Sequence, residues 1–570
     1  MDILIVAGDS SAGLAITQSL GAAGYHCCLA GTSQRHPSFA SRYPRLRDVH
    51  PDPMKHSQGF ADWVIAMQCR HRFRLIIPPT EETMIPLAAR RDHPDLEGVL
   101  ALPPADAMAI GFDKEKVRLL GEEIGVRSPS NILASSPADL DDPRLDEWIR
   151  DAVVVKTTQS KVFKDGRAQE YQAQMFTGRE QLNREVLALL ASTPVQLQQW
   201  VPGRGVGIEV LARHGELVLV FAHERINEVP LTGGASSYRK SVTPAPALVE
   251  DSARLMRALS WHGVAMIEFR VDVETHRHWL IEINGRFWGS LPLATFAGAD
   301  FPRALVEMLL EDRVPDERMP ARTEVYARRF SRELAWLKHA IKHRNDDNPL
   351  LLKRPIPSAL CEWARPLLGK ETWDGARLAD PGPITYEVAT ALSQEAMIIA
   401  RKVRRQALLR VAGPTSKRRL RAAAKRGVKR VLVLCYGNIC RSPYGGIRLQ
   451  QLAGEDLEVS SAGFHDHIGR PSPDFIVEAA AARGLDVSEH RSRLATQDEL
   501  DRADLIVLMD QRNHDLLAAM SDSALRKSVW LGALGDGGVE IDDPYDEPER
   551  ASEVLAQIDE ALEGLLAALA

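Results

Sequence analysis

The chain has 570 residues, of which 45% are hydrophobic and 26% are charged. These ordinary globular values exclude a collagen, a largely disordered chain and a small disulfide-built scaffold. At roughly 100–200 residues per domain, the length predicts about three to five domains. The net charge of −6 is unevenly distributed, because residues 401–430 hold thirteen Lys or Arg and no acidic residue. The remainder is acidic, so we expect no nucleic-acid partner for the protein surface as a whole.

Short β-type runs alternate with helical runs over residues 1–110, beginning with ILIVAG at residues 3–8. This alternation predicts a parallel sheet with crossover helices, as in a Rossmann-like domain. The turn at residues 8–13 lacks the full G-x-G-x-x-G pattern, so a tight turn without a ligand and a dinucleotide site both remain open. The start has no basic leader, and no stretch of 18 apolar residues occurs, so we expect a cytoplasmic protein.

Strand-like runs dominate from residue 111 to about residue 330, and several of them alternate polar with apolar residues as antiparallel strands do. Glu268 and Glu282 lie on successive runs about fourteen residues apart, a spacing that predicts a hairpin. Asn284 then shares a face with Glu282 by the two-residue period. Oxygen ligands of this kind suit Mg²⁺ that bridges nucleotide phosphates, with Arg286 on the phosphate side. Two solvent-facing glutamates on an edge strand are the alternative.

Further residues complete a known pattern. Lys114 follows Gly111-Phe112-Asp113, Lys156 ends the apolar run VVVK, and Gln198-Gln199-Trp200-Val201 follows a strand-like run. Together with the carboxylates, residues 1–330 resemble the ATP-grasp superfamily, especially its carboxylate-amine ligase branch. The resemblance implies that the two lysines contact the phosphates of ATP and that residues 198–201 hold the adenine. It also implies that Glu268, Glu282 and Asn284 hold two Mg²⁺ ions, with Mn²⁺ as an alternative.

The substrate side of this resemblance rests on His223-Glu224-Arg225 and on Gly233-Gly234-Ala235-Ser236. Arg225 is the candidate clamp for a carboxylate or an acyl phosphate, and Ser236 lies in the candidate substrate loop. The implied partners are a small-molecule carboxylate and an amine. One departure is the loop Thr157-Thr158-Gln159-Ser160, which lacks the glycines that many relatives place over the phosphates.

Residues 331–400 show no chemical motif and are expected to be helical, and residues 401–430 form a candidate basic linker. The last domain, residues 431–570, has 11 basic and 26 acidic residues. Because its charge is opposite to that of the linker, we expect the two to make an intramolecular contact. A weak contact with an anionic membrane surface is the main alternative, whereas the absence of interleaved aromatic residues disfavours RNA. The predicted domains are 1–110, 111–330, 331–428 and 429–570.

The strongest chemical pattern follows the apolar run at residues 431–434. The segment Cys435-Tyr436-Gly437-Asn438-Ile439-Cys440-Arg441-Ser442-Pro443 leads from this expected strand into an expected helix. A thiol then stands at a loop whose backbone N–H groups bind a tetrahedral oxyanion, which favours the thiolate form of Cys435. Arg441 can fork onto two oxygens of a phosphoryl group. Asp543, in Ile541-Asp542-Asp543-Pro544-Tyr545, is the candidate general acid and base.

These residues resemble the low-molecular-weight protein tyrosine phosphatases, and the resemblance extends over 431–570. It includes Ser461-Ala462-Gly463, Gly484-Leu485-Asp486, His490-Arg491-Ser492 and Met509-Asp510. It implies that Cys435 is the nucleophile, Arg441 the phosphate clamp and Asp543 the general acid and base. Asn438 would organise the loop, Ser442 would bond the thiolate, and Cys440 would trap oxidised Cys435 as a disulfide. The implied substrate is a phosphorylated small molecule or a phosphotyrosine protein.

Two departures lie beside the expected pocket. Phe464-His465-Asp466-His467 stands where the family usually places an aromatic residue after Ser-Ala-Gly, and Tyr545 is retained but is followed by acidic Asp546. Phosphohydrolysis is therefore expected, while a preference for phosphotyrosine stays open. An arsenate reductase is disfavoured, because it needs further cysteines and none follows Cys440.

The sequence thus predicts an α/β multidomain protein. It comprises a Rossmann-like domain, an ATP-grasp α+β domain, a helical connector and a C-terminal α/β phosphatase domain with a parallel sheet. Our leading hypothesis is a bifunctional enzyme that joins an ATP- and Mg²⁺-dependent carboxylate-amine ligase to a cysteine-dependent phosphatase. One alternative is a regulatory tyrosine phosphatase whose ATP-grasp domain senses nucleotide without ligating. Another is a scaffold directed to a membrane surface by residues 401–430.

Overall fold

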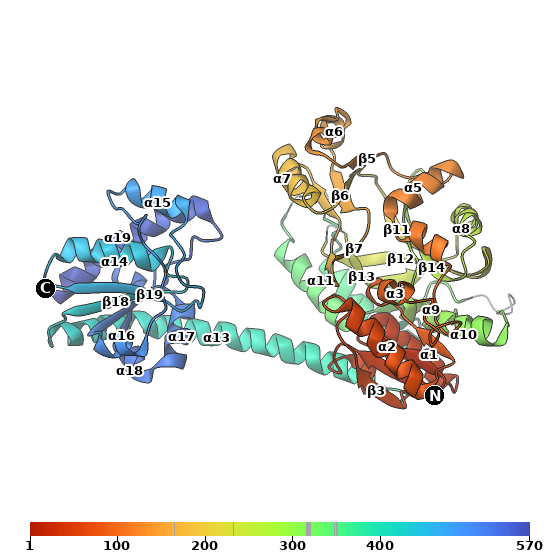
Figure 1. The fold of residues 1–570 in the computed structure, drawn as a ribbon, viewed down its shortest axis with the longest axis horizontal. Helices are drawn as coiled ribbons and strands as arrows, with labels where there is room; N and C mark the ends of the chain where they lie inside the picture. Colours follow the sequence, from red (N-terminus) through yellow and green to blue (C-terminus); the bar gives the residue numbers. More distant parts are fainter. Residues whose placement is uncertain (165, 232, 315–320, 347, 349–350) are drawn as a thin grey trace. The chain divides into compact units, whose positions relative to one another are not determined.

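The computed structural model describes residues 1–164, 166–231, 233–314, 321–346, 348 and 351–570. The chain divides into two compact units, Met1–Ser393 and Gln394–Ala570 (Figure 1). Among the described residues, no helix has both the length and the apolar character that crossing a membrane requires.

The first unit begins with a parallel sheet, whose strands lie in the order β3 (Leu46–Val49), β2 (Cys27–Gly31), β1 (Ile3–Ile5) and β4 (Leu75–Ile77). The helical segments of this region are α1 (Ser11–Ala22), η1 (Pro37–Ala40), α2 (Ser57–His71) and α3 (Glu81–Ala88). One face of the sheet packs on α1 and the other packs on α2, so the strands are buried on both sides. Continuous apolar runs are typical of such strands, and the predicted Rossmann-like domain is confirmed.

A small antiparallel sheet follows, in the order β5 (Asn131–Ala134), β10 (Val195–Gln199), β6 (Val153–Thr157) and β9 (Gln174–Phe176). Two helices precede it, α4 (Ala105–Gly111) and α5 (Lys114–Glu123). Between its strands the chain forms η2 (Pro137–Asp141), α6 (Arg144–Trp148) and α7 (Arg179–Leu190). It also forms a separate hairpin of β7 (Lys161–Lys164) with β8 (Arg167–Glu170). Val153 and Val155 face the helices in a shared core. The two-residue period therefore turns Lys156, Gln196 and Gln198 to the opposite face.

The largest sheet has seven strands in the order β15 (His278–Asn284), β14 (Gly263–Val271), β11 (Arg204–Arg213), β12 (Glu216–Val229), β13 (Ala235–Ser241), β16 (Tyr326–Arg328) and β17 (Glu371–Trp373). All neighbours are antiparallel except β16 and β17. The helix α8 (Pro246–Ala258) shares one core with this sheet, and α9 (Leu291–Ala297) and α10 (Phe301–Glu311) share another. The ATP-grasp α+β arrangement that we predicted is confirmed.

The segment after residue 330 is helical, as expected, but it also supplies a strand. Its helices are α11 (Phe330–Lys342), α12 (Ile356–Cys361), η3 (Glu362–Leu368) and the start of α13 (Gly382–Ala424). The strand β17 pairs in parallel with β16 and extends the large sheet. Buried Glu371 on β17 accepts a hydrogen bond from Arg328 on β16 at 2.6 Å. Three residues are too few to leave a periodic pattern, which is why the sequence did not reveal this strand.

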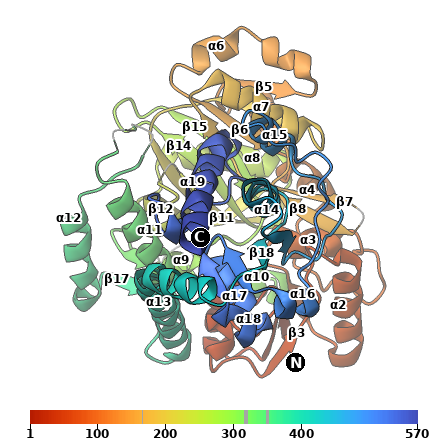
Figure 2. The same cartoon turned by 90° about the vertical axis from the view of Figure 1, so that its left-hand side faces the viewer.

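The second unit contains a parallel sheet in the order β19 (Glu458–Gly463), β18 (Arg430–Cys435), β20 (Leu505–Leu508) and β21 (Ser528–Trp530). One face packs on α14 (Arg441–Ala453), α15 (Asp474–Ala481) and α19 (Ala551–Leu569). The other packs on α16 (Gln497–Arg502), α17 (Gln511–Met520) and α18 (Asp522–Arg526), and η4 (Gly532–Leu534) and η5 (Pro548–Arg550) complete the unit. Figure 2 shows α16, α17 and α18 grouped together, away from α15. The predicted α/β domain with a parallel sheet is confirmed.

Residues 401–424 of the basic segment are helical and belong to α13, whereas Arg430 already begins β18. Leu420 and Ala423 join the core of the second unit. Arg405 donates to Glu540 Oε2 at 2.6 Å, an ion pair between the basic segment and the acidic domain. An intramolecular contact of this kind was one of the alternatives that the charge distribution left open. The compact unit starts at Gln394, whereas the sequence pattern predicts a domain start at 429.

Candidate active sites

A short loop at the carboxyl end of β18 joins this strand to α14. Cys435 ends β18 and Arg441 begins α14, so the loop comprises residues 436–440. Asn438 has a φ of 50°, a left-handed conformation that Asn adopts more readily than most residues. The first turn of α14 contains no acidic residue. The positive end of this helix is therefore free to attract an anion beside the thiol.

Hydrogen bonds from the loop converge on the thiol of Cys435, which is buried at 2% exposure. Ser442 Oγ donates to Cys435 Sγ at 3.0 Å. Asn438 Nδ2 in turn donates to Ser442 Oγ at 2.9 Å and lies 3.2 Å from Ser461 Oγ. A hydroxyl that donates to sulfur stabilises the thiolate form, which is the nucleophilic one. The structure thus brings together the predicted nucleophile, its hydroxyl partner and the loop organiser, whose roles stay predictions.

Arg441 lies behind the loop and is 1% exposed. It donates to Asp510 Oδ2 at 2.6 Å, to the carbonyl of Ile541 at 2.8 Å and to Asp543 Oδ2. Burial alone would lower the pKa of Arg441, but Cys435, Asp543 and Asp510 raise it above its ordinary value. Its Nε is buried and has no partner among the described residues. A guanidinium with an unused buried donor can donate a charge-assisted hydrogen bond to an oxygen of a phosphoryl group.

Asp543 and Cys440 differ in exposure, and this difference separates their chemistry. The Asp543 side chain is 40% exposed, so it can reach a leaving oxygen at the mouth of the loop. Tyr545 beside it is 53% exposed, and its amide donates to Asp543 Oδ1 at 3.4 Å. Burial, with contributions from Asp543 and Cys435, raises the pKa of the Cys440 thiol. Cys440 is therefore protonated at neutral pH, which leaves Cys435 as the candidate nucleophile.

Three residues outside the predicted set hold the loop in place. His490 Nε2 lies 2.8 Å from the carbonyl of Asn438, and the amide of Arg493 donates to Asn438 Oδ1 at 3.0 Å. Asp510 holds Arg441, as described above. The resemblance covers His490 and Asp510 but gives them no role, and no local pattern marks a residue that acts at a distance of fifty positions or more.

The departures beside the pocket are built around Tyr436. The guanidinium of Arg512 lies over the Tyr436 ring at 3.2 Å from its centroid, and the His465 ring meets the same ring edge-on at 5.3 Å. Phe464 packs into the hydrophobic core instead. In the segment after Ser-Ala-Gly it is therefore His465, not Phe464, whose ring lies beside the Cys435 loop, in contact with Tyr436.

In the first unit, two carboxylates and an amide meet on the hairpin of β14 and β15. Glu268 lies directly opposite Glu282, and Asn284 Nδ2 donates to Glu282 Oε1 at 3.0 Å. Lys114 Nζ is 3.6 Å from Glu282 Oε2, and Arg225 donates to Glu268 Oε2 at 2.5 Å. The hairpin spacing therefore predicted the correct cross-strand pair, and the carboxylates have the cations that their burial requires.

Both predicted phosphate-binding lysines reach this hairpin. Lys156 Nζ lies 3.5 Å from the carbonyl of Ile281, and burial lowers the pKa of Lys156 to about 8, although Glu282 opposes the shift. Burial would raise the pKa of Glu282, but Lys114 and Lys156 hold it at about 2. Lys114 Nζ also donates to Ser160 Oγ at 2.6 Å, in the loop that lacks glycines. Two ammonium groups thus flank an ionised carboxylate, as a polyphosphate site requires.

The predicted adenine-binding segment runs along the end of β10. Gln198 is buried and lines a small pocket together with both lysines. Gln199 ends the strand, and Trp200 and Val201 follow in half-buried positions. The carbonyl of Val201 accepts a hydrogen bond from Arg270 Nε at 3.1 Å. Gln198 therefore borders the lysine pocket, and the role of residues 198–201 in holding adenine stays a prediction.

The two predicted substrate residues are placed differently. Arg225 reaches Glu268 and also lies 3.4 Å from the carbonyl of Gly234. The hydroxyl of Ser236 donates to the carbonyl of Tyr238 at 3.0 Å, within its own strand. Among the described residues, no contact joins Ser236 to Arg225 or to the carboxylate pair. Arg225 thus belongs to the site by geometry, whereas Ser236 has only its position on β13.

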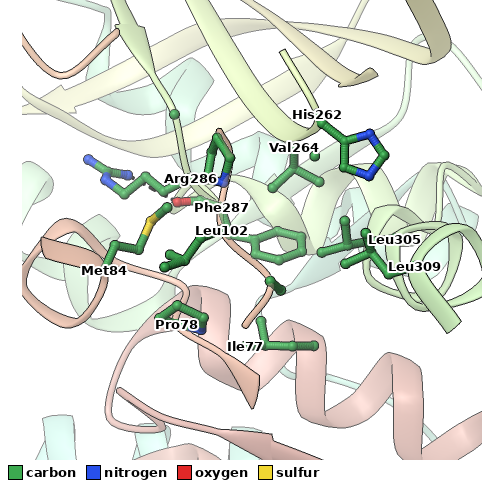
Figure 3. Close-up of a pocket in the computed structure, with 14 residues that line it drawn as sticks. Ile77, Pro78, Met84, Leu102, His262, Val264, Arg286, Phe287, Leu305 and Leu309 are labelled. Carbon is green, nitrogen blue, oxygen red and sulfur yellow. Dashed lines mark hydrogen bonds between the residues drawn. The ribbon is translucent and has the colours of Figure 1, made fainter. Parts of the chain in front are cut away.

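Arg286 follows the hairpin. Its Nη2 donates to Asn284 Oδ1 at 3.0 Å, and its Nε donates to Glu81 Oε1 at 3.2 Å. Figure 3 shows a largely apolar pocket between Arg286 and the Rossmann-like sheet, lined among others by Ile77, Met84, Leu102, Phe287, Leu305 and Leu309. Neither lysine lines this pocket, so it is separate from the candidate phosphate site.

The residues present fit Mg²⁺ with a nucleotide. The described residues contain no group of three or more His, Cys, Asp or Glu side chains that could hold a metal ion alone. Mg²⁺ bound to nucleotide phosphates needs only one or two protein carboxylates, because phosphates and waters supply the remaining ligands. Glu268, Glu282 and the amide oxygen of Asn284 are such a set, and the two lysines can pair with the phosphates.

Comparison with known proteins matches one family profile to each part of the chain that carries a candidate site. The profile of the family described as "Low molecular weight phosphotyrosine protein phosphatase" matches residues 430–570. The profile described as "ATP-grasp in the biosynthetic pathway with Ter operon" matches residues 192–332. The second match contains Glu268, Glu282 and Asn284.

Two relatives cover the second unit. The "Probable low molecular weight protein-tyrosine-phosphatase EpsP" of Ralstonia solanacearum is 38% identical over 118 residues, which are 21% of this chain and 79% of that protein. The "Low molecular weight protein-tyrosine-phosphatase Wzb" of Escherichia coli K12 is 35% identical over 115 residues, 20% of this chain and 77% of that protein.

Among solved structures, an L-amino acid ligase from Bacillus licheniformis is 17% identical with a TM-score of 0.45, and the likeness covers 57% of this chain and 78% of that chain. A likeness of this strength supports no conclusion about activity. The sequence relatives and the family profiles show membership: the chain belongs to the low-molecular-weight protein-tyrosine-phosphatase family through its second unit, and joins to it an ATP-grasp module of the Ter-operon type.

Proposed function

We propose that the second unit hydrolyses phosphate monoesters through a phosphocysteine. The observation that carries this proposal is the 3.0 Å hydrogen bond from Ser442 to Cys435, at the start of a loop backed by Arg441. Membership of the phosphatase family supports it. The contacts around Tyr436 leave open whether the substrate is a phosphotyrosine protein or a phosphorylated small molecule.

The reaction has two balanced steps. In the first, the Cys435 thiolate attacks phosphorus, the bond from phosphorus to the ester oxygen breaks, and Asp543 gives its proton to the departing oxygen. In the second, water attacks phosphorus, the S–P bond breaks, and Asp543 takes the proton from the water. Arg441 leaves its ion pair with Asp543 to bind two phosphoryl oxygens, and this exchange frees the carboxyl group for proton transfer.

The test is hydrolysis of a generic aryl phosphate by the full chain. Cys435→Ser should lower kcat/KM by more than about a thousandfold, because a serine hydroxyl is not ionised at neutral pH. Cys69→Ser is the matched control, since Cys69 is an exposed thiol on α2 of the first unit. Hydrolysis that survives Cys435→Ser would sink the assignment.

We further propose that the ATP-grasp module is an ATP- and Mg²⁺-dependent carboxylate-amine ligase, which activates a small-molecule acid as an acyl phosphate and passes it to an amine. The paired carboxylates Glu268 and Glu282, flanked by Lys114 and Lys156, support this proposal. Bound Mg²⁺ would neutralise phosphate charge as the γ-phosphoryl group moves. Arg225 is our candidate for holding the reacting carboxylate, and its contact with Glu268, beside the proposed metal site, supports this role.

Release of ADP that depends on both an acid and an amine is the measurement for this second proposal. Glu282→Ala should abolish that release, while hydrolysis of aryl phosphate continues at the wild-type rate. The alternative is a nucleotide sensor that does not ligate. If ATP binds measurably but a broad screen of acid and amine pairs releases no ADP, the sensor replaces the ligase.

A further inference from the structure

Three arginines meet where β13, the start of α11 and the start of α1 come together. Arg239 lies on β13, Arg329 precedes α11, and Arg332 lies in its first turn. We call them the arginine cluster. Arg332 is half-buried, and its pKa is lowered to about 10 by loss of water and by the nearby charges of Arg329 and Arg239. Three guanidinium groups therefore lie close together in a partly buried region.

Neighbouring carboxylates neutralise the arginine cluster only in part. Arg239 pairs with Asp374 at 2.5 Å, and Arg329 Nε lies 3.6 Å from Glu387. The guanidinium of Arg332 makes no hydrogen bond or ion pair with any residue that the structure describes. The Nε of Arg239, a side chain only 1% exposed, also lacks a partner among those residues. Asp374 Oδ2 is also without a hydrogen-bond partner among those residues. The two carboxylates still carry one charge fewer than the three arginines, so guanidinium donors remain for an anion.

The amino end of α1 adds to the positive character. Arg329 Nη1 donates to Ser11 Oγ at 2.7 Å. Ser11 is the first residue of this 12-residue helix, whose first turn contains no acidic residue. His36 lies nearby, and burial together with Arg329 lowers its pKa to about 4, so it is neutral at pH 7. A bound anion would meet guanidinium donors and a helix N-terminus together.

The arginine cluster lies on the same face of the large sheet as the carboxylate pair. Arg225 on β12 is the direct cross-strand partner of Arg239 on β13, so the two side chains project from one face. Arg225 in turn contacts Glu268 on β14. Three strand spacings of about 4.8 Å separate β14 from β13, which places the cluster on the order of 14 Å from the carboxylate pair. One elongated molecule can therefore reach both places.

We propose that the arginine cluster binds a second anionic group of the acid substrate, at the end remote from the carboxylate that reacts. This inference rests on the proposed ligase function, and it names the substrate class as an elongated acid with a carboxylate or a phosphate at its far end. Arg332, together with the donors of Arg329 that Ser11 and Glu387 do not engage, would bind the anion. Arg239 stays paired with Asp374 and adds positive charge beside them.

A purely structural role explains the arginine cluster less well. An arginine that only ties segments together is paired, as Arg328 is with Glu333 and Glu371 in the core nearby. Burying an unpaired guanidinium opposes folding, because the group loses water without gaining a partner. Arg332 is half-buried, and Asp374 and Glu387 offset its loss of water only in part. A bound anion would supply the direct partner that its guanidinium lacks among the described residues.

The experiment measures binding first. Isothermal titration of the full chain, with Mg²⁺ and a non-hydrolysable ATP analogue present, compares unbranched diacids from glutarate to sebacate with their monomethyl esters. A second arm uses monoacids of matching length that end in a phosphate. The wild type should bind the best dianion at least about tenfold more tightly than the matching ester. The better of the two arms identifies the anionic end.

Three variants locate the binding site. Arg332→Gln and Arg329→Gln should each remove most of the preference for the dianion, and Arg332→Lys should restore part of it. Arg144→Gln, which changes an exposed arginine on α6, should leave the preference intact. Unchanged thermal melting of Arg332→Gln shows that the fold is kept. Equal binding of diacid and ester by the wild type, no binding of either, or a preference that persists in Arg332→Gln overturns the proposal.

Turnover separates this inference from the proposed ligase function. With an active amine, Arg332→Gln should raise KM for the dianion about tenfold or more and leave kcat and the KM for ATP nearly unchanged, because the remote group binds equally in ground and transition states. A wild type that discriminates in titration but never releases ADP contradicts the ligase and leaves the anion site standing. A large fall in kcat with an unchanged KM contradicts the anion site alone.

Discussion

The two candidate active sites are assembled in opposite ways. The phosphatase site is almost contiguous: Cys435, Asn438, Arg441 and Ser442 lie within eight positions, and only Asp543 comes from far along the chain. The ATP-grasp site draws its residues from α5, β6, β10, β12, β14 and β15, between residues 114 and 286. A contiguous site depends on the shape of one loop. A dispersed site depends on the register of whole sheets, so changes far from its chemistry can disturb it.

Removal of metal should separate the two sites most widely. With excess EDTA, release of ADP should fall to background, since the carboxylate pair needs Mg²⁺ to accept a nucleotide. Aryl phosphate hydrolysis should be unchanged, because the Cys435 loop binds phosphate through backbone and arginine donors. Parallel assays of one preparation check both expectations. Loss of hydrolysis in EDTA would contradict the metal-free account of the loop.

Asp543→Asn tests the one distant residue of the contiguous site. An amide cannot give a proton, so kcat/KM for phenyl phosphate, which reports only the first step, should fall about a hundredfold or more. The fall in kcat/KM should be smaller for p-nitrophenyl phosphate, whose leaving group needs little protonation. Values of kcat/KM for both esters provide the measurement. An equal fall for the two esters would show that Asp543 acts by holding Arg441 rather than as an acid.

Asn438→Ala tests whether the loop fixes its own shape. The change removes side-chain hydrogen bonds to Ser442 and from the Arg493 amide, and it places alanine at a positive φ. We expect a loss of about 1–3 kcal/mol in the unfolding free energy of the second unit. Activity should fall about tenfold as the thiolate loses its support. Urea unfolding checks the first expectation, with Asn513→Ala, a residue buried in α17, as a comparison.

Glu81→Gln probes the dispersed site from a distance. Glu81 begins α3 of the Rossmann-like domain and accepts a hydrogen bond from Arg286 beside the carboxylate hairpin. Weakening this partly exposed contact should raise KM for ATP about threefold, an effect in the range of ordinary charge-assisted hydrogen bonds. Phosphatase rates should not change. If Glu81→Gln leaves KM for ATP unchanged, the contact between Glu81 and Arg286 does not contribute to the ATP site.

The sequence predicted the contiguous site more completely than the dispersed one. Cys435, Asn438, Arg441 and Ser442 were found together because one loop carries them, and strand and helix on either side are fixed by local pattern. The pairing of Glu268 with Glu282 was also predicted, because a hairpin is a local structure.

Contacts that join distant segments could not be predicted. No pattern indicates that Asp510 holds Arg441 across 69 positions. The same reason applies to the arginine cluster: Arg239 and Arg332 are 93 positions apart, with the strands β14, β15 and β16 between them, and each resembles a surface arginine when it is seen alone. The three-residue strand β17 was too short to show a period.

Trapping the covalent intermediate tests the central account of the phosphatase most directly. The full chain is mixed with an aryl phosphate, quenched in acid within one turnover, digested and examined by mass spectrometry. We predict one phosphoryl group on the peptide that contains Cys435, at the thiol of that residue, and none in Cys435→Ser. Hydrolysis at the wild-type rate with phosphate found on another residue, or on none, would contradict it.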